Sequence, residues 1–329
     1  MKKNGSAYSP LFIWAACIIP QLIWAAAGPV IKITQNYIPT IEFLFIRFLI
    51  TCVVLLPFVY LELKRTRIDL KDLPNLIALG ILGYGSMLFL FEGFRYTTAI
   101  DAAIIGVVAP IIEVAAGNYF YKEKLSLRYK IGVLLAIVGT IVVVIEPALI
   151  HSTSNNASSR ILGNIFVLVY NFGFASYIVL SKSLMGENSS RLLNVLRYFG
   201  IKKNSYKYSP FMQTSLSFYI ALAFFTGLLV LKSSLSPASL DLNIRIFETK
   251  ALLGVLYMAI LSGISAYTLY SWGLHRVSVS FAAIFSYLMP VFTLPFAYFM
   301  LGEVPTPVAL IGSAIIGTGI LIAEYKTRV

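Results

Sequence analysis

The sequence predicts an all-α integral membrane protein with ten transmembrane helices, arranged as two inverted five-helix repeats. Three observations support this fold class. First, 58% of the 329 residues are hydrophobic and only 12% are charged, whereas soluble domains are about half apolar and about a quarter charged. Second, apolar runs of bilayer-spanning length follow one another along the chain. Third, the second half of the chain repeats the first.

The apolar runs define ten candidate spans, each near the length of about 20 residues that crosses a bilayer. Each span has to be helical, because lipid offers the backbone N–H and C=O groups no other partner. The first span also resembles a signal peptide, but its removal would leave one span of the repeat unpaired. The spans cover residues 11–32, 40–63, 73–95, 98–121, 128–149, 161–184, 210–232, 250–274, 277–301 and 305–325.

The basic residues orient the chain in the membrane. When the loops are assigned alternately from a cytoplasmic N-terminus, 19 of the 26 Lys and Arg residues fall on the N-terminal side and six on the other. Excess Lys and Arg marks cytoplasmic loops. We therefore expect a multi-pass protein of the cell membrane with both termini in the cytoplasm. The net charge of +12 is explained by this orientation and does not indicate a nucleic-acid partner.

The internal repeat is clearest at a shift of 180 residues. Between residues 91–140 and 271–320 this shift gives nine identities without a gap. Each repeat contains five spans, an odd number, so the second repeat enters the membrane from the opposite side. The identities pair Gly93 with Gly273, Ala102–Ile104 with Ala282–Ile284, Pro110 with Pro290, Glu123 with Glu303, Ile131–Gly132 with Ile311–Gly312, and Gly139 with Gly319.

The repeat divides the chain into two units. The first covers residues 11–150 and the second covers residues 161–325. The second unit contains an additional cytoplasmic segment at about 185–209. Inverted repeats are typical of transporters, because two related halves can rock about a site near the midplane.

The repeated motif resembles the EamA domain of the drug/metabolite transporter superfamily. Pro39 and Arg47 in the second span also resemble that pattern. The resemblance covers nearly the whole chain. It rests on Gly93-Phe94-Arg95-Tyr96-Thr97-Thr98-Ala99, Pro110, Glu123 and Gly132 in the first half, and on Gly273-Leu274, Val277, Pro290, Gly302-Glu303 and Gly312 in the second.

The resemblance implies a secondary-active permease with a central cavity between the halves and no bound cofactor. Its substrate is then a small molecule, and export of metabolites or amino acids by alternating access is the leading hypothesis. A broad-specificity drug exporter and a sugar-phosphate or nucleotide-sugar exchanger stay open. An exchanger is less favoured, since a dianionic substrate calls for several cations and only Arg47 lies within a span.

A membrane-embedded enzyme or a channel is a remote alternative, and we expect no catalytic residue. Membrane transferases need paired carboxylates for Mg²⁺ or a His-centred base. The four Asp residues form no such motif, and His151 and His275 stand apart. Cys17 and Cys52 lie in separate spans without a Cys-x-x-Cys motif, so the sequence predicts neither a metal site nor a disulfide.

Three prolines near the middles of spans are predicted to break their helices. Pro20, Pro110 and Pro290 lie in spans one, four and nine. Each removes one helical hydrogen bond and leaves a carbonyl without its donor. A packing kink is one interpretation. The other is that these breaks line a pathway at the midplane, where protein or water supplies the missing partners.

Glu113 and Arg47 are the charged residues predicted inside spans. Glu113 shares one helix face with Gly106, Pro110 and Gly117, and a charge at this depth has to face protein or a water-filled cavity. We weigh a structural ion pair with Arg47, substrate or proton binding, and burial in the neutral form. Glu42 and Glu92 are other candidate partners for Arg47.

Aromatic and polar-tipped residues within the spans are the remaining candidates for substrate binding. Most such residues serve packing or anchor a span at the interface. We prefer Gln21 and Tyr84, which are expected closest to the midplane. The predicted substrate-binding set also includes Glu113, Trp24, Tyr267 and Tyr287. Trp272 is a further aromatic residue within a span.

The additional cytoplasmic segment contains an apolar stripe. Leu192, Val195, Leu196 and Phe199 share one helical face, and basic residues flank them between Arg191 and Lys203. Such a helix can lie on anionic lipid headgroups, although a solvated connector is the plainer interpretation. Beyond the bilayer and the small-molecule substrate, the sequence indicates no further partner and leaves a homodimer open.

We predict that a cysteine at position 203, in a background without Cys17 and Cys52, is protected from membrane-impermeant maleimide in intact cells and is labelled in inverted vesicles. The reason is the excess of Lys and Arg on that side of the membrane. A cysteine at position 245, on the opposite side, is the control and should show the reverse pattern. Labelling of position 203 from outside would contradict the orientation.

Overall fold

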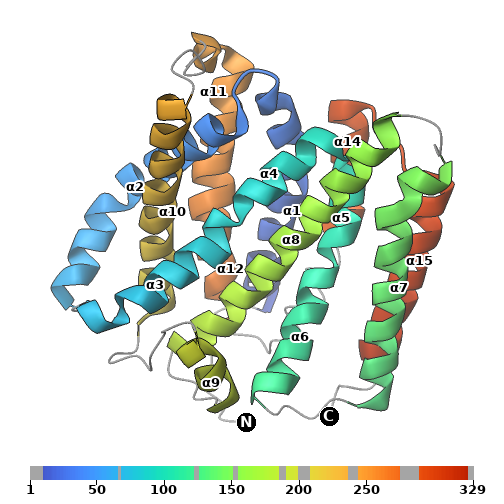
Figure 1. The fold of residues 1–329 in the computed structure, drawn as a ribbon, viewed down its shortest axis with the longest axis horizontal. Helices are drawn as coiled ribbons and strands as arrows, with labels where there is room; N and C mark the ends of the chain where they lie inside the picture. Colours follow the sequence, from blue (N-terminus) through green and yellow to red (C-terminus); the bar gives the residue numbers. More distant parts are fainter. Residues whose placement is uncertain are drawn as a thin grey trace.

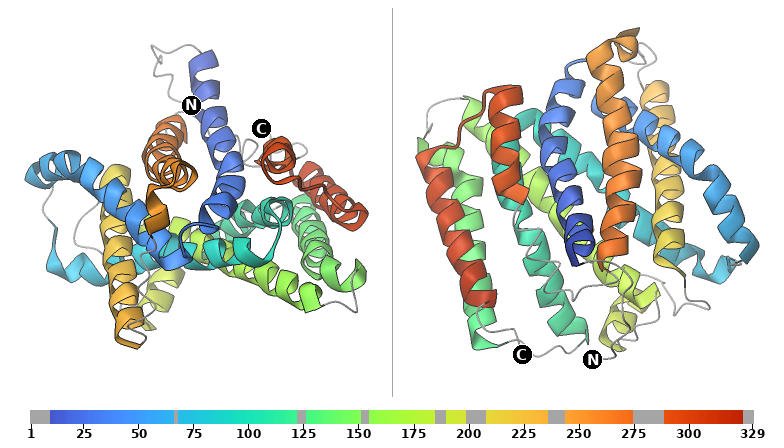
Figure 2. Two further views of the ribbon diagram at one scale, coloured as in Figure 1. Left: turned by 90° about the horizontal axis from the view of Figure 1, so that it is seen from above. Right: turned by 180° about the vertical axis from the view of Figure 1, so that it is seen from behind.

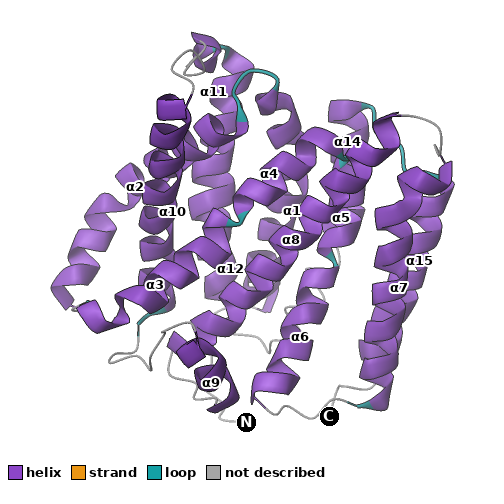
Figure 3. Cartoon of the chain, in the orientation of Figure 1, coloured by secondary structure: helices purple, strands orange, loops and turns teal. Residues whose placement is uncertain are grey.

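Every regular element in the described part of the chain is a helix (Figure 3), as the sequence predicted. The computed structural model describes residues 10–65, 68–121, 126–150, 155–184, 190–198, 208–235, 244–274 and 289–324. The helices are α1 (Pro10–Gln35), α2 (Thr40–Arg65), η1 (Leu70–Asp72), α3 (Leu73–Gly80), η2 (Ile81–Gly85), α4 (Met87–Tyr96), α5 (Ala99–Gly106), α6 (Val108–Tyr121), α7 (Leu127–Ile150), α8 (Asn155–Leu184), α9 (Ser190–Tyr198), α10 (Pro210–Leu235), η4 (Ile244–Phe247), α11 (Thr249–Leu256), η5 (Tyr257–Ser265), α12 (Ala266–Leu274), α14 (Met289–Leu301) and α15 (Pro307–Glu324).

The helices follow the predicted spans. Within the described ranges, seven are long and apolar enough to cross a membrane, and three shorter apolar helices accompany them at Ala99–Ile112, Met289–Leu301 and Pro307–Ile322. The protein is therefore a multi-pass integral membrane protein. Of the predicted ninth span, only the part from Met289 lies within the described residues.

Successive spans run in opposite directions. As a result α1 begins and α15 ends at the same end of the molecule (Figure 1). We call the opposite end, where α1 ends and α2 begins, the distal end. The common position of the start of α1 and the end of α15 agrees with an even number of crossings.

Many apolar side chains face outward, and several charged side chains are buried. On α2, for example, Val53 and Phe58 are more than half exposed, while Glu42 and Arg47 are almost fully buried. A soluble protein shows the reverse distribution. The outward apolar surface suits contact with lipid, and the buried charges have to find partners inside the protein.

Helices α7 and α15 pack side by side at one edge of the molecule (Figure 2). Glycines bring their backbones close together: a Cβ atom at Gly139 would lie 2.7 Å from the Gly312 carbonyl oxygen, and one at Gly319 would lie 2.6 Å from that of Gly132. At the 180-residue shift, Gly132 corresponds to Gly312 and Gly139 to Gly319. The two contacts are therefore the same contact with the halves exchanged.

Two π-helical segments interrupt the third and eighth spans. They are η2 (Ile81–Gly85) and η5 (Tyr257–Ser265). A shift of 180 residues moves η2 onto residues 261–265, which lie inside η5. Wide π turns are rare and occur frequently at functional sites. Their equivalent positions make the middles of these two spans candidates for a common site.

The prolines behave differently from one another. Helix α1 continues through both Pro20 and Pro29, so the chain stays helical on both sides of Pro20, and a pathway-lining role for Pro20 stays a prediction. The fourth span does break, at Val107 between α5 and α6, and Pro110 lies in the first turn after the break. A proline is tolerated in a first helical turn, where its missing N–H has no intrahelical partner. Pro290 lies at the start of the described part of α14.

At the end opposite the distal end, Tyr208 connects two segments that are far apart in sequence. Its hydroxyl donates to Asp72 at 2.8 Å and accepts from the backbone N–H of Asp69 at 3.3 Å. Burial raises the pKa of Tyr208 to about 12, so the hydroxyl stays protonated and able to donate. Next to it, Ser209 donates to Glu62. These contacts fix the start of α10 against the α2–α3 connection.

The packing of α7 on α15 predicts opposite effects for two glycine substitutions on one helix. Gly319→Ala should lower the melting temperature in detergent, since the new Cβ meets a backbone carbonyl that cannot give way. Gly317→Ala should leave it unchanged or raise it, because no described atom lies within 4 Å and Ala favours a helix by up to about 1 kcal/mol over Gly. Equal melting temperatures for both variants would contradict the close packing.

Candidate functional site

Aromatic side chains from α1, η2 and α12 meet beside the two π-helical segments. The Trp24 ring lies 5.0 Å from that of Tyr267 and 5.2 Å from that of Tyr270. Tyr267 in turn lies 5.8 Å from Tyr84 in η2. Three residues that the sequence predicted for substrate binding, from three different spans, are thus brought into one cluster.

Tyr84 stands at the centre of a wider set of rings. Its ring lies 4.6 Å from Phe218 on α10 and 5.5 Å from Tyr177 on α8. Its hydroxyl is buried without a hydrogen bond of good geometry and interacts electrostatically with those of Tyr177 and Tyr267. Gly83 permits this arrangement, because a Cβ atom there would lie 2.5 Å from the Tyr177 ring.

Side chains from neighbouring helices bind the carbonyl groups of η5. The indole N–H of Trp24 donates to the Ser262 carbonyl at 3.1 Å. The Thr51 hydroxyl lies 3.2 Å from the Ala259 carbonyl and 2.9 Å from that of Arg47. A π turn shifts the normal hydrogen-bond register, so such carbonyls are open to outside donors. Sequence analysis missed Thr51 because a threonine within an apolar span carries no distinctive signal.

Pro29, which the sequence analysis also missed, explains one further contact. A proline at position 29 leaves the Ala25 carbonyl without its helical donor. Thr293 on α14 lies close to this carbonyl, with 3.3 Å between the oxygen atoms. At the 180-residue shift, Thr293 corresponds to Glu113. Helix α14 thereby binds directly to α1 at the edge of the aromatic cluster.

Arg47 is almost fully buried next to this cluster. Its guanidinium carbon lies 5.3 Å from the centre of the Phe48 ring and 5.7 Å from that of Phe91. One terminal nitrogen donates to the Met87 sulfur at 3.4 Å, and Nε has no partner. Gln21, one turn before Trp24 on α1, is also buried, and its Nε2 is unpaired.

The predicted partners of Arg47 are bound elsewhere. Glu42 pairs with Lys232 on α10, and Glu92 pairs with Arg95 at 3.2 Å. The predictions that Glu42 or Glu92 pairs with Arg47 are therefore wrong. The physical reason is that a carboxylate side chain is short, so each glutamate pairs with a cation closer to the distal end. The side chain of Glu113 and all of Tyr287 lie outside the described residues, so their roles stay predictions.

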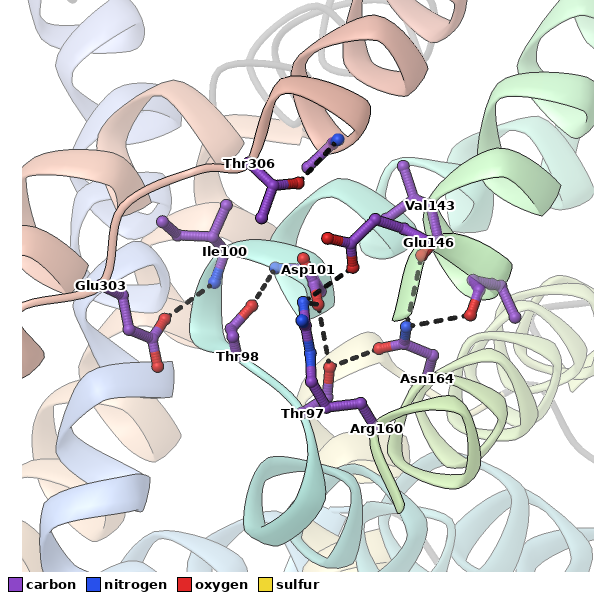
Figure 4. A network of polar contacts seen from close by, with 12 residues as sticks. Thr97, Thr98, Ile100, Asp101, Val143, Glu146, Arg160, Asn164, Glu303 and Thr306 are labelled. Carbon is purple, nitrogen blue, oxygen red and sulfur yellow. Dashed lines mark hydrogen bonds and ion pairs between the residues drawn. The ribbon is translucent and has the colours of Figure 1, made fainter. Parts of the chain in front are cut away.

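A second polar cluster, the distal network, joins five segments at the distal end (Figure 4). Arg160 on α8 pairs with Asp101 on α5 at 2.6 Å and with Glu146 on α7 at 2.9 Å. Thr97 donates to Asn164 and lies 3.3 Å from Asp101. The network consists of Lys32, Thr97, Asp101, Glu146, Arg160, Asn164 and Glu303.

Glu303 completes the distal network from the second half of the chain. Its carboxylate accepts from the backbone N–H groups of Ala99 at 2.7 Å and Ile100 at 3.3 Å, in the first turn of α5, where a negative charge is favoured. Lys32 lies 3.3 Å from the same carboxylate and donates to the Thr97 carbonyl. Glu303 therefore fastens the loop before α15 to both α1 and α5.

The helix α9 occupies part of the additional segment. Leu192 is buried, whereas Val195 is 43% exposed, and Arg191 donates to the Tyr119 carbonyl at the end of α6 at 2.8 Å. The predicted apolar stripe thus packs partly on the protein. Its contact with anionic lipid stays a prediction. Among the described residues, no three His, Cys, Asp or Glu side chains gather as a metal site requires.

Comparison with known proteins places this geometry in a family. Residues 11–145 and 192–325 each match the EamA-like transporter family. The chain is 23% identical to an uncharacterized transporter of Archaeoglobus fulgidus, over 94% of this chain and 96% of that protein. It is 24% identical to a probable amino-acid metabolite efflux pump of Salmonella typhimurium, over 95% and 94%.

A solved crystal structure shares the fold. It has a TM-score of 0.54 at 18% sequence identity and covers 95% of both chains. The match of the family over both halves confirms the resemblance drawn from the repeated Gly, Pro and Glu positions. The chain belongs to the EamA-like transporter family, and it is a transmembrane transporter, not an enzyme.

Proposed function

We propose that the protein is a secondary-active exporter of small metabolites or amino acids that works by alternating access. The observation that carries the proposal is the cluster of Trp24, Arg47, Tyr84 and Tyr267, which come from both halves of the chain and meet beside the π-helical segment η2. The name of the Salmonella relative, an amino-acid metabolite efflux pump, supports amino acids as the substrate class.

The proposal includes ten crossings in two inverted repeats. Three observations support this arrangement: the reciprocal glycine contacts between α7 and α15, the equivalent positions of η2 and η5, and the common end at which α1 begins and α15 ends. Two halves related in this way can adopt two mirrored states around one central site. The distal end is then extracellular.

Saturable, uphill transport is the direct test. Purified protein in liposomes should accumulate or release labelled amino acids from a metabolite panel, with a rate that saturates with substrate and that responds to an imposed pH gradient. Liposomes without protein supply the background. A flux that rises linearly with substrate would favour a channel, and no flux of any metabolite or amino acid would refute the proposed function.

Glu113 is our candidate for coupling to protons. Its helix α6 packs against α8, which also supplies Tyr177 to the aromatic cluster, and its repeat counterpart Thr293 contacts α1. Glu113→Gln keeps the shape of the side chain but cannot titrate. We expect it to abolish transport driven by a pH gradient and to spare substrate binding. Undiminished uphill transport by this variant would exclude the coupling role.

Alternating access also requires the distal network to open. In the structure, Glu303 links the second half to Lys32 and to the start of α5. Glu303→Gln removes the charge from these contacts, so the state open at the distal end should become more populated. A loss of about 1 kcal/mol gives about a fivefold shift.

A cysteine at Gly106 reports this opening, because no described atom lies within 4 Å of the position of its Cβ. In a background without Cys17 and Cys52, Glu303→Gln should speed its labelling by external maleimide about fivefold. Glu92→Gln is the matched control: Glu92 pairs only within α4 and should leave the rate unchanged. Equal rates for all three proteins would show that Glu303 does not hold the distal end closed.

A further inference from the structure

Four cations of the described helices pair with carboxylates, whereas Arg47 does not. Lys32 pairs with Glu303, Arg95 with Glu92, Arg160 with Asp101 and Glu146, and Lys232 with Glu42. Arg47 is only 1% exposed, yet no described carboxylate lies within the 4.0 Å that defines an ion pair. A buried guanidinium with no anion is strongly unfavourable.

The contacts that Arg47 makes do not compensate its charge. A guanidinium carries five N–H donors, but the Met87 thioether, a weak acceptor, takes one of them, and Nε has no acceptor. The rings of Phe48 and Phe91 contribute only cation–π attraction. The protein therefore leaves hydrogen-bonding capacity at this position that a bound anion can use.

The surroundings of Arg47 are aromatic. The tyrosines of three other spans, Tyr84, Tyr170 and Tyr267, interact electrostatically with the guanidinium. Trp24 and Phe218 extend the same ring cluster. A ligand bound to Arg47 thus finds apolar ring faces beside its charged group, with hydroxyl groups among them.

We propose that Arg47 binds the carboxylate of the transported substrate, and that the substrate is a monocarboxylate whose apolar part packs on the rings of Trp24, Tyr84 and Tyr267. The inference rests on the proposed function and specifies its substrate. The planar guanidinium matches a carboxylate with two parallel hydrogen bonds. One cation suits one negative charge, so dianions such as sugar phosphates bind poorly.

Glu113 is the competing internal partner, and packing argues against it. Helix α2, which carries Arg47, packs against α10, α4, α11 and η5, whereas α6, which carries Glu113, packs against α8, α7 and α9. The two helices lie apart in Figure 1 and in the right-hand view of Figure 2. A substrate between the halves can reach Arg47 without requiring α6 to approach α2.

The test measures ligand binding by the shift in melting temperature of the purified full-length protein. The probes are L-phenylalanine, 3-phenylpropanoate and L-phenylalaninamide, of which only the amide lacks a carboxylate. We expect the two carboxylates to stabilise the wild type and the amide to have no effect. Stabilisation by the amide as strong as by the acids, or no stabilisation by any probe, would overturn the proposal.

Substitution of Arg47 provides a second, independent test of the proposal. Arg47→Gln should weaken carboxylate binding on the order of 30-fold or more, as expected for one partner of a buried charged pair. Arg47→Lys, which keeps the charge without the planar fork, should weaken it less. Arg95→Gln is the matched control and should bind like the wild type, because Arg95 is half exposed and pairs only with Glu92.

The outcomes separate this proposal from the proposed function. Unchanged carboxylate affinity in Arg47→Gln overturns the assignment, even when the wild type transports amino acids. If carboxylate binding depends on Arg47 but the protein transports nothing in liposomes, the exporter hypothesis is refuted. The assignment of Arg47 as a carboxylate-binding residue then still holds. If Arg47→Gln does not fold, the comparison of acid with amide in the wild type and the Arg47→Lys variant still decide the question.

Discussion

A charge or a backbone polar group has no partner in hydrocarbon, so each has to be paired inside the protein. This constraint accounts for the buried polar residues of the structure. Lys232 reaches across to Glu42, and Arg160 binds two carboxylates at once. In the π-helical segment η5, the Ser262 carbonyl accepts from Trp24, and the Ala259 carbonyl lies close to the Thr51 hydroxyl. The ion pairs and hydrogen bonds that satisfy this constraint also join helices that are distant in sequence.

The same constraint separates two kinds of charge. Those of the distal network are paired within the protein, and Glu303 links the two halves; we propose that they hold one state of the molecule. Arg47 lies deeper and has aromatic neighbours in place of an anion. A transporter has to leave some binding capacity unsatisfied at its site, since a site that is fully paired by the protein has nothing to offer a substrate.

Where two helices have no polar pair between them, glycine residues allow their backbones to pack closely. Helices α7 and α15 approach through Gly132, Gly139, Gly312 and Gly319, without any ion pair between them among the described residues. Lipid gives no hydrophobic drive for two apolar helices to associate, so tight van der Waals contact between small residues has to supply it. At the centre of the protein, the missing side chain of Gly83 likewise makes room for the ring of Tyr177.

The sequence by itself determined the family, the helical fold class, the multi-pass membrane location and the repeat, because span length, composition and the recurrence of Gly, Pro and Glu are properties of the chain alone. It also pointed to Trp24, Tyr84, Tyr267 and Arg47, since polar groups within apolar spans stand out. Only the tertiary structure decided which of them meet and which carboxylate each cation takes. It placed Glu303 on the start of α5 and removed Glu42 and Glu92 from Arg47. The physical reason is that pairing depends on distances between helices far apart in the chain, whereas periodicity and composition describe each helix separately.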